Sequence, residues 1–143
     1  MVWLIFFHVL GASVWVGGHL VLATTFLPRA LKKKDPRIIQ SFEEQFERIG
    51  IPALLLQVIT GVWMALIYVP FEEWLSLAST HHRFLWMKLG LLAGTIGLAV
   101  HARLFIIPKL SAENLPSLAF HIVLVTLLAV SFVWVGLSFR FGG

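Results

Sequence analysis

Residues 2–27 read VWLIFFHVLGASVWVGGHLVLATTFL and contain no charged side chain. Pro28 follows this stretch, and Arg29 opens a basic segment. A helix needs about 20 mostly apolar residues to cross a bilayer, and three further stretches meet that requirement, at residues 49–71, 84–107 and 115–139. No Lys or Arg precedes position 29, so the first stretch is interpreted as a spanning helix and not as a cleaved signal peptide. The sequence predicts an all-α, up-down-up-down transmembrane bundle of four helices, forming one domain over residues 1–143.

The composition excludes several classes of protein. Of the 143 residues, 59% are hydrophobic and 13% are charged, which excludes a soluble monomer. The net charge of +4 does not indicate nucleic-acid binding, because the basic residues lie between the apolar stretches. The chain has no Cys, so disulfides and thiolate ligands are excluded, and metal chemistry must use His, Met, carboxylates or the backbone.

The distribution of Lys and Arg predicts the orientation. Most of them lie on one side of the predicted helices, namely Arg29, Lys32, Lys33, Lys34, Arg37, Arg48, Arg103 and Lys109. The other side has Arg83, Lys88 and Arg140. By the positive-inside rule, both termini are expected outside a bacterial-type cytoplasmic (inner) membrane. A short amphipathic helix at the cytoplasmic surface, running into the second span, is expected from the helical spacing of Ile38, Ile39, Phe42, Phe46 and Ile49.

Polar residues inside the spans are expected to fall into two layers. Counted from the cytoplasmic helix ends, each helix contributes one polar residue at a similar depth, and these are His19, Gln57, His101 and His121. A thinner outer layer contains His8, Met64, Tyr68 and Met87. In the third span, Gly90, Gly94 and Gly97 lead to His101 along one face. That face either admits a flat macrocycle or lets another helix approach closely.

The main interpretation of the inner layer is a site for b-type haem. Such a haem commonly takes two neutral imidazoles from different helices, here His19 with His101, or either of them with His121. Gly94 and Gly97 would face the ring, and Gln57 would lie in the same layer. The propionates would be met by Arg103, Lys109, Arg29 or Arg48. A second haem would need His8 and Met87. The expected role is electron transfer with a quinol, a porphyrinogen or a redox partner protein, so the chain would be an oxidoreductase if it is an enzyme.

Copper binding is the alternative. Cu(I) favours His and Met where Cys is absent, and a path across the membrane needs ligands at successive depths. His8, Met64 and Met87 would supply the outer part of the path, and His19, His101 and His121 the inner part. A third possibility is a structural subunit of a larger complex, or a homodimer formed through a glycine face, in which the His residues only join helices by hydrogen bonds.

The remaining polar residues are less informative. His81 and His82 are expected in a loop, with a solvated or interfacial role or as a metal capture point. Lys88 is expected to extend toward the headgroups. All Asp and Glu residues lie outside the predicted apolar cores, which argues against hydrolysis and against a carboxylate-based proton pump.

Several short motifs carry a family resemblance. They are His8-Val-Leu-Gly-Ala-Ser-Val-Trp-Val-Gly-Gly18, Phe46-Glu-Arg leading to Thr60-Gly61, Trp86-Met-Lys88-Leu, and Arg103 followed by Pro108-Lys-Leu110. In this order and spacing the chain resembles the copper-resistance D (CopD-like) family of membrane proteins. The opening His-x-x-Gly-x-x-x-Trp-x-x-Gly and Lys88 are also similar to the small bacterial membrane-bound protoporphyrinogen oxidases, a haem-containing four-helix family. That second resemblance would make His8 and Lys88 its functional positions.

Overall fold

The computed structural model describes residues 1–74 and 80–141, and these residues form helices joined by short turns. The elements are α1 (Val2–Val21), η1 (Leu22–Phe26), α2 (Leu27–Lys33), α3 (Arg37–Tyr68), η2 (Phe71–Glu73), α4 (Thr80–His101), η3 (Ala102–Ile106), η4 (Ile107–Lys109) and α5 (Leu115–Phe141). Four helical segments are long and apolar enough to cross a membrane, and they cover Val2–Lys33, Arg37–Tyr68, His82–Lys109 and Leu115–Arg140. The all-helical transmembrane fold expected from the sequence is confirmed.

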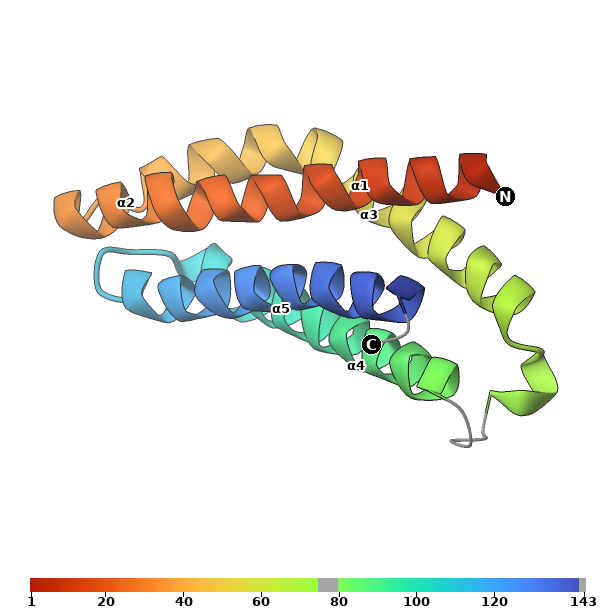
Figure 1. Cartoon of the computed structure of the whole chain (residues 1–143). Helices are drawn as coiled ribbons and strands as arrows, with labels where there is room; N and C mark the ends of the chain where they lie inside the picture. Colours follow the sequence, from red (N-terminus) through yellow and green to blue (C-terminus); the bar gives the residue numbers. More distant parts are fainter. Residues whose placement is uncertain (75–79, 142–143) are drawn as a thin grey trace.

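The helices form two pairs that lie side by side. α1 packs along α3, α4 packs along α5, and α5 also contacts α1 (Figure 1). Both chain ends lie at the same end of the bundle (Figure 1). The α2–α3 turn and the α4–α5 connection lie at the opposite end, which we call the basic end because it contains Lys32, Lys33, Lys34, Arg37 and Lys109.

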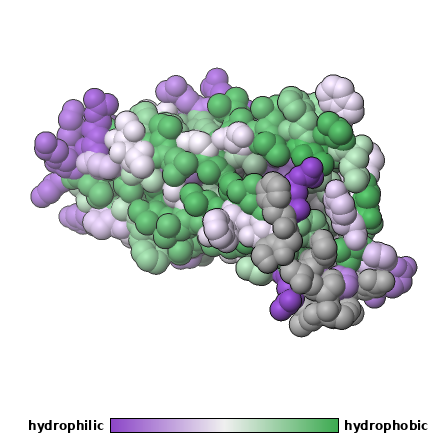
Figure 2. Space-filling view, in the orientation of Figure 1, coloured by the Kyte–Doolittle hydropathy of each residue, from purple (hydrophilic) through white to green (hydrophobic). Residues whose placement is uncertain are grey.

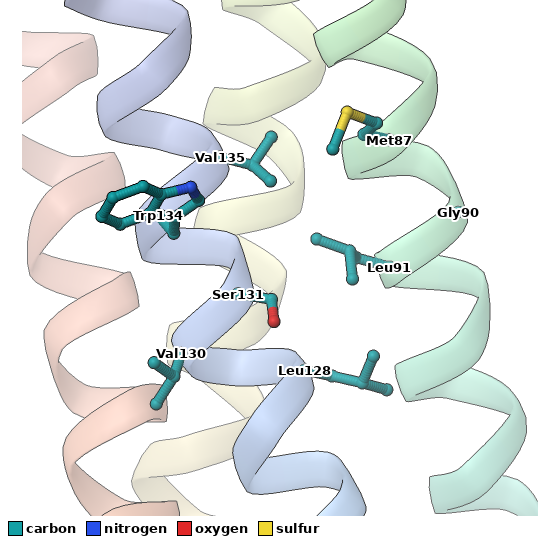
Figure 3. A pocket seen from close by; sticks show the side chains of 8 residues that line it. All are labelled: Met87, Gly90, Leu91, Leu128, Val130, Ser131, Trp134 and Val135. Carbon is teal, nitrogen blue, oxygen red and sulfur yellow. The ribbon is translucent and has the colours of Figure 1, made fainter. Parts of the chain in front are cut away.

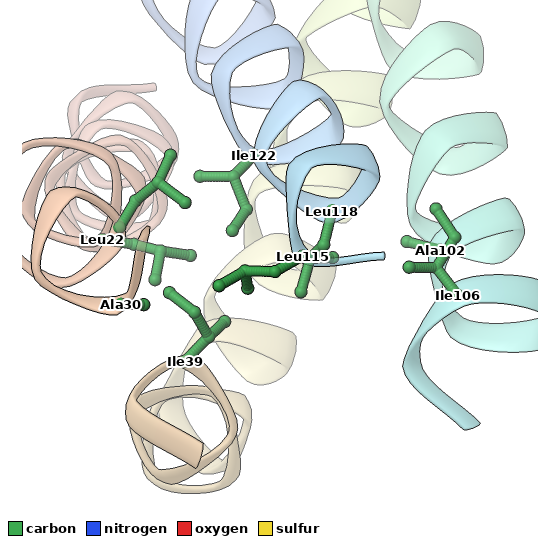
Figure 4. Packing of buried hydrophobic residues seen from close by; sticks show 9 residues of the cluster. Leu22, Ala30, Ile39, Ala102, Ile106, Leu115, Leu118 and Ile122 are labelled. Carbon is green, nitrogen blue, oxygen red and sulfur yellow. The ribbon is translucent and has the colours of Figure 1, made fainter. Parts of the chain in front are cut away.

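The buried core lies near the basic end, where both helix pairs meet. Its residues are Leu22, Leu27, Ala30, Ile39, Ala102, Ile106, Leu115, Leu118 and Ile122 (Figure 4). Elsewhere most apolar side chains face outward, and only 6% to 28% of the most apolar window of each span is buried. Apolar side chains cover much of the surface beyond the basic end (Figure 2). A surface of this kind is stable in lipid and not in water.

Pro28 does not end the first helix, contrary to the sequence-based expectation. The helix continues to Lys33 and ends at Lys34, which adopts the left-handed conformation with a φ of 52°. A proline lacks an N–H and its ring clashes with the carbonyl four residues earlier in an α-helix. The π-helical turn η1, just before Pro28, widens the backbone there, and η3 occupies the same place before Pro108.

The amphipathic segment runs directly into the second span, as expected from the sequence. It forms the first part of α3, which runs without a break from Arg37 through Pro52 to Tyr68. Its apolar face packs against the first helix, since the ring centroids of Phe42 and Phe26 are 4.6 Å apart. The helix that follows the turn at Lys34 therefore begins about twelve residues earlier than residue 49, where the second span was expected to start.

Candidate functional site

The seam between α1 and α3 contains two of the intramembrane histidines. His8 Nδ1 lies 3.0 Å from the Gln57 carbonyl oxygen and 3.1 Å from Thr60 Oγ1. A carbonyl oxygen only accepts hydrogen bonds, so Nδ1 of His8 carries the proton and Nε2 has the free lone pair. Gly61 makes room for this ring, because a Cβ at position 61 would lie 3.0 Å from His8 Cε1. His8 is thus fixed against α3 in one tautomer.

His19 is held in the same way farther along the seam. Its Nδ1 lies 2.9 Å from the carbonyl oxygen of Trp15, one helical turn earlier, so Nε2 again has the lone pair. The ring contacts Trp15 and Phe46, at centroid distances of 4.4 and 5.7 Å. The backbone oxygen of His19 accepts a 3.3 Å hydrogen bond from Thr126 Oγ1 on α5. This bond ties the histidine to the second helix pair.

His101 and His121 form a direct pair between α4 and α5. His101 Nδ1 lies 2.9 Å from His121 Nε2, and His121 Nδ1 lies 2.9 Å from the carbonyl oxygen of Ser117. His101 is exposed and His121 is half-buried. Because the Ser117 carbonyl requires a proton on His121 Nδ1, His121 Nε2 accepts from His101 Nδ1 when both rings are neutral. His101 Nε2 then has the remaining lone pair.

The prediction that four polar residues share one inner layer is wrong. Thr126 contacts His19, so the two residues lie at the same depth. Thr126 is five residues beyond His121 on α5, so His19 lies about 7.5 Å deeper than His121. Gln57 is deeper still, because a Cβ at Gly11 would lie 3.4 Å from Gln57 Cβ. Gln57 therefore belongs with His8. The depth count failed because the helices extend beyond Pro28 and before residue 49.

The residues instead form a series of steps from the basic end. His101 and His121 come first, His19 follows about 7.5 Å deeper, and His8 lies eleven residues farther along α1, about 16 Å away. Gln57 lies before His8 on this path, and among the described residues its Oε1 is buried without a hydrogen-bond partner. Of the expected histidine pairs, the structure brings together His101 and His121, whereas His19 packs on Trp15 and Phe46.

The two predicted methionine ligands lie on different helices, Met64 on α3 and Met87 on α4. Met87 lines a groove of about 670 Å³ between α4 and α5 together with Gly90, Leu91, Leu128, Val130, Ser131, Trp134 and Val135 (Figure 3). His8 faces α3 instead, so the structure does not show the expected His8–Met87 pair. Met64 lies half-buried on α3, and Tyr68 packs on Phe139 with ring centroids 5.8 Å apart.

The glycine face of α4 is open. A Cβ would meet no atom of the described chain within 4 Å at Gly90 or Gly97, and at Gly94 it would make ordinary contact, 3.5 Å from Leu128. Close helix packing occurs at other glycines, on α1 and α3. There, a Cβ at Gly18 would overlap the Phe46 ring and one at Gly11 would lie 2.7 Å from the Ala53 carbonyl oxygen.

Some of the cationic residues also differ from expectation. Arg103 forms an ion pair with Glu47 of α3, which occupies the guanidinium group that was expected to meet a propionate. Lys88 was expected to extend toward the headgroups, and its Nζ lies 4.8 Å from the centre of the Phe139 ring, near the end of α5. His82 was expected in a solvated loop, but it is buried in the first turns of α4, with 7% of its surface exposed.

The fixed rotamers of these histidines could not be found from the sequence. The carbonyl groups that hold His19 and His121 belong to residues four positions earlier in the same helix, and any residue type supplies such a carbonyl. The sequence also did not predict that the Phe46 ring packs between Gly18 and Gly50. Its signal was the helical spacing of Phe46 within the amphipathic segment, which was attributed to the membrane surface.

Comparison with known proteins identifies the family. A family model described as "Copper resistance protein D" matches residues 40–139, which include the second, third and fourth apolar helices. No curated protein and no solved structure matches the chain. The match supports the first resemblance drawn from the sequence, whereas nothing in it supports similarity to protoporphyrinogen oxidases. The chain is an integral membrane protein that belongs to the copper resistance protein D family.

Proposed function

We propose that this protein binds copper inside the membrane and passes it between the two faces, with imidazole nitrogens as successive binding positions. Family membership supports copper as the metal. The chain has no Cys, so histidine is the main soft nitrogen donor that it can offer. Haem binding, with electron transfer to a quinol, porphyrinogen or partner subunit, has no comparable support, because the family model that matches the chain is one for copper resistance.

One observation carries the proposal: three intramembrane imidazoles are held in the same tautomer by backbone carbonyl groups. Nδ1 of His8, His19 and His121 lies 2.9 to 3.0 Å from the carbonyl oxygens of Gln57, Trp15 and Ser117. Metal-binding histidines almost always donate their second ring N–H to a carbonyl, a carboxylate or water, which fixes the ring and raises the basicity of the ligating nitrogen. Each of these rings therefore presents Nε2 in the form that binds a metal.

The positions of the imidazole rings suit the passage of copper ions across the membrane, and not their storage at one site. They lie at three depths, so an ion moving along the helices would meet a nitrogen donor near the basic end, a second one deeper and a third beyond it. Gln57 Oε1, a buried acceptor without a partner among the described residues, lies on the α3 side of the longest step. By the positive-inside rule we place the basic end in the cytoplasm and both termini outside an inner membrane.

Copper uptake by proteoliposomes tests this function. Vesicles containing the wild-type protein should accumulate radioactive copper, and His19→Ala and His8→Ala should each reduce the initial rate at least tenfold. Ser13→Ala is a matched control, because Ser13 lies between the two histidines on α1 and its hydroxyl bonds only to its own helix, at the Val9 carbonyl. The control should transport at the wild-type rate.

Two results would contradict the proposal. One is copper uptake that is unchanged in both histidine variants. The other is protein purified with stoichiometric iron and a strong Soret band, which would return the histidines to haem ligation.

A further inference from the structure

The His101–His121 pair offers a metal two donors and no more. Among the residues that the structure describes, no group of three or more His, Asp or Glu side chains is placed to hold an ion. Zinc in structural sites almost always takes four ligands in a tetrahedron, and Cu(II) prefers a square-planar or tetragonal set of nitrogen and oxygen donors. Cu(I), a closed-shell ion, is stable with two donors on opposite sides. The number of donors thus favours a monovalent ion.

The two imidazole rings lie end to end. Their planes differ by 6°, and their centroids are 5.0 Å apart. The distance between His101 Nδ1 and His121 Nε2 is 2.9 Å. An imidazole nitrogen lies about 1.2 Å from its ring centre, so rings joined in line by such a hydrogen bond have centroids about 5.3 Å apart. The observed value is close to this, so the two lone-pair directions point along nearly one line.

A two-coordinate ion fits on that line with a small movement. Imidazole nitrogen to metal bonds are about 2.0 Å long, so a linear site needs about 4 Å between the two nitrogens. The pair would have to open by about 1 Å. His121 is held by the Ser117 carbonyl, whereas the exposed His101 is free to supply the movement through its side-chain torsions.

Binding of the ion moves one proton within His101 and releases none from the pair. In the neutral pair, His101 Nδ1 holds the only proton between the rings. If that proton moves to His101 Nε2, Nδ1 and His121 Nε2 both present lone pairs to the ion. His121 keeps its Nδ1 proton on Ser117, no proton leaves the pair, and the site gains one positive charge.

We infer that His101 and His121 form a linear, two-coordinate site for a monovalent soft cation, so that the protein takes copper as Cu(I) and not as Cu(II). This inference rests on the proposed function and specifies its substrate. Ag(I), which has the same charge and the same preference for two donors but does not change oxidation state, is the appropriate probe.

Nitrogen NMR of the full chain in detergent, labelled with ¹⁵N-histidine, tests the site directly. On addition of ¹⁰⁹Ag(I), one-bond silver–nitrogen coupling should appear at His101 Nδ1 and His121 Nε2. In His101→Ala the coupling at His121 Nε2 should disappear, and in His121→Ala the coupling at His101 Nδ1 should disappear. His19→Ala is the control for folding and specificity, because it leaves the pair intact, and there both couplings should persist. Competition with Zn(II) in 100-fold excess should not displace the silver.

The outcomes separate this inference from the proposed function. Absence of coupling at these two nitrogens, or displacement of the silver by Zn(II), would overturn the two-coordinate site. If copper uptake still depended on His8 and His19 in that case, the proposed function would stand without it. Coupling that remains at one nitrogen when its partner is replaced would also refute a shared site.

Discussion

The two helix pairs use glycine in opposite ways. In the α1–α3 seam, neighbouring groups fill the space beside the glycines. Phe46 lies between Gly18 and Gly50, and the Ala53 carbonyl approaches Gly11. On α4, Gly90 and Gly97 face open space in the described chain. Glycine spacing by itself therefore does not distinguish a packing surface from an open one. The difference lies in whether the partner helix supplies a group that fills the space.

The same difference separates the histidines. His8 and His19 lie half-buried in the closed seam against α3, whereas His101 on the open pair is exposed. An enclosed imidazole can hold an ion away from water, and an exposed one can take it up or release it. The two helix pairs would then perform different parts of a passage, and the following predictions test how distinct they are.

The largest effect is expected from Gly18→Ala in the closed seam. The new methyl group would overlap the ring of Phe46, which cannot retreat because Gly50 contacts its other edge. Overpacking of this kind costs about 3 kcal/mol of unfolding free energy. Thermal unfolding in detergent measures the change. Phe46→Leu, added to Gly18→Ala, should restore part of the stability, and failure of that rescue would show that Phe46 is not the obstacle.

Gly97→Ala provides the matched change in the open pair. Its Cβ would meet no atom of the described chain within 4 Å, and alanine favours a helix over glycine by up to about 1 kcal/mol. We expect unchanged or slightly higher stability in the same unfolding assay. A clear loss would mean that another molecule covers this face, such as a second copy in a homodimer or a subunit of a larger complex.

Thr126→Val tests the link between the pairs. The Thr126 hydroxyl donates to the His19 carbonyl at 3.3 Å and to the Ile122 carbonyl at 2.7 Å. Hydrogen bonds between membrane helices are worth about 0.6 kcal/mol on average. A loss of this size is expected in chemical unfolding, together with faster amide hydrogen exchange only at the α1–α5 contact. A loss several times larger would show that the two pairs do not act separately.

The smallest effect concerns pH and the turn that closes the first pair. Hydrogen bonds from Arg37 hold the pKa of Asp35 below its ordinary value. A carboxylate with a lowered pKa in the folded state contributes stability above about pH 4, and this contribution is lost as pH falls through the folded pKa. Wild-type protein should lose slightly more stability than Asp35→Asn between pH 5 and pH 3, to be measured by thermal unfolding.

The connection of the second pair offers a comparison for that experiment. It is held by Asn114, whose side chain donates to the Lys109 carbonyl and accepts from the Ser111 N–H, each at 2.7 Å. An amide does not titrate, so Asn114→Ala should lower stability by the same amount at pH 5 and at pH 3. Equal pH dependence of the wild type and Asp35→Asn would show that Arg37 does not stabilise the folded carboxylate.

The sequence was sufficient for the four helices because each contains a long apolar stretch. It was not sufficient for depth, since the count began at Pro28 and at residue 49, whereas the helices continue to Lys33 and begin at Arg37. An error of that size moved Gln57 into the wrong layer. The pairing of His101 with His121 was among the expected alternatives, but their orientation depends on the Ser117 carbonyl and on rotamers that no residue pattern encodes.

The π-helical turn η1 has a consequence for the rotation of the first helix. Leu22 and Leu27 are five residues apart, yet both are buried in the same core, a spacing that a regular α-helix does not place on one face. If the same residues were wound as a regular α-helix, everything before them would be turned by about 100° relative to α2. His19 would then lose its contact with the Phe46 ring. The π-helical turn η1 thus sets the direction in which His8 and His19 face around the axis of α1.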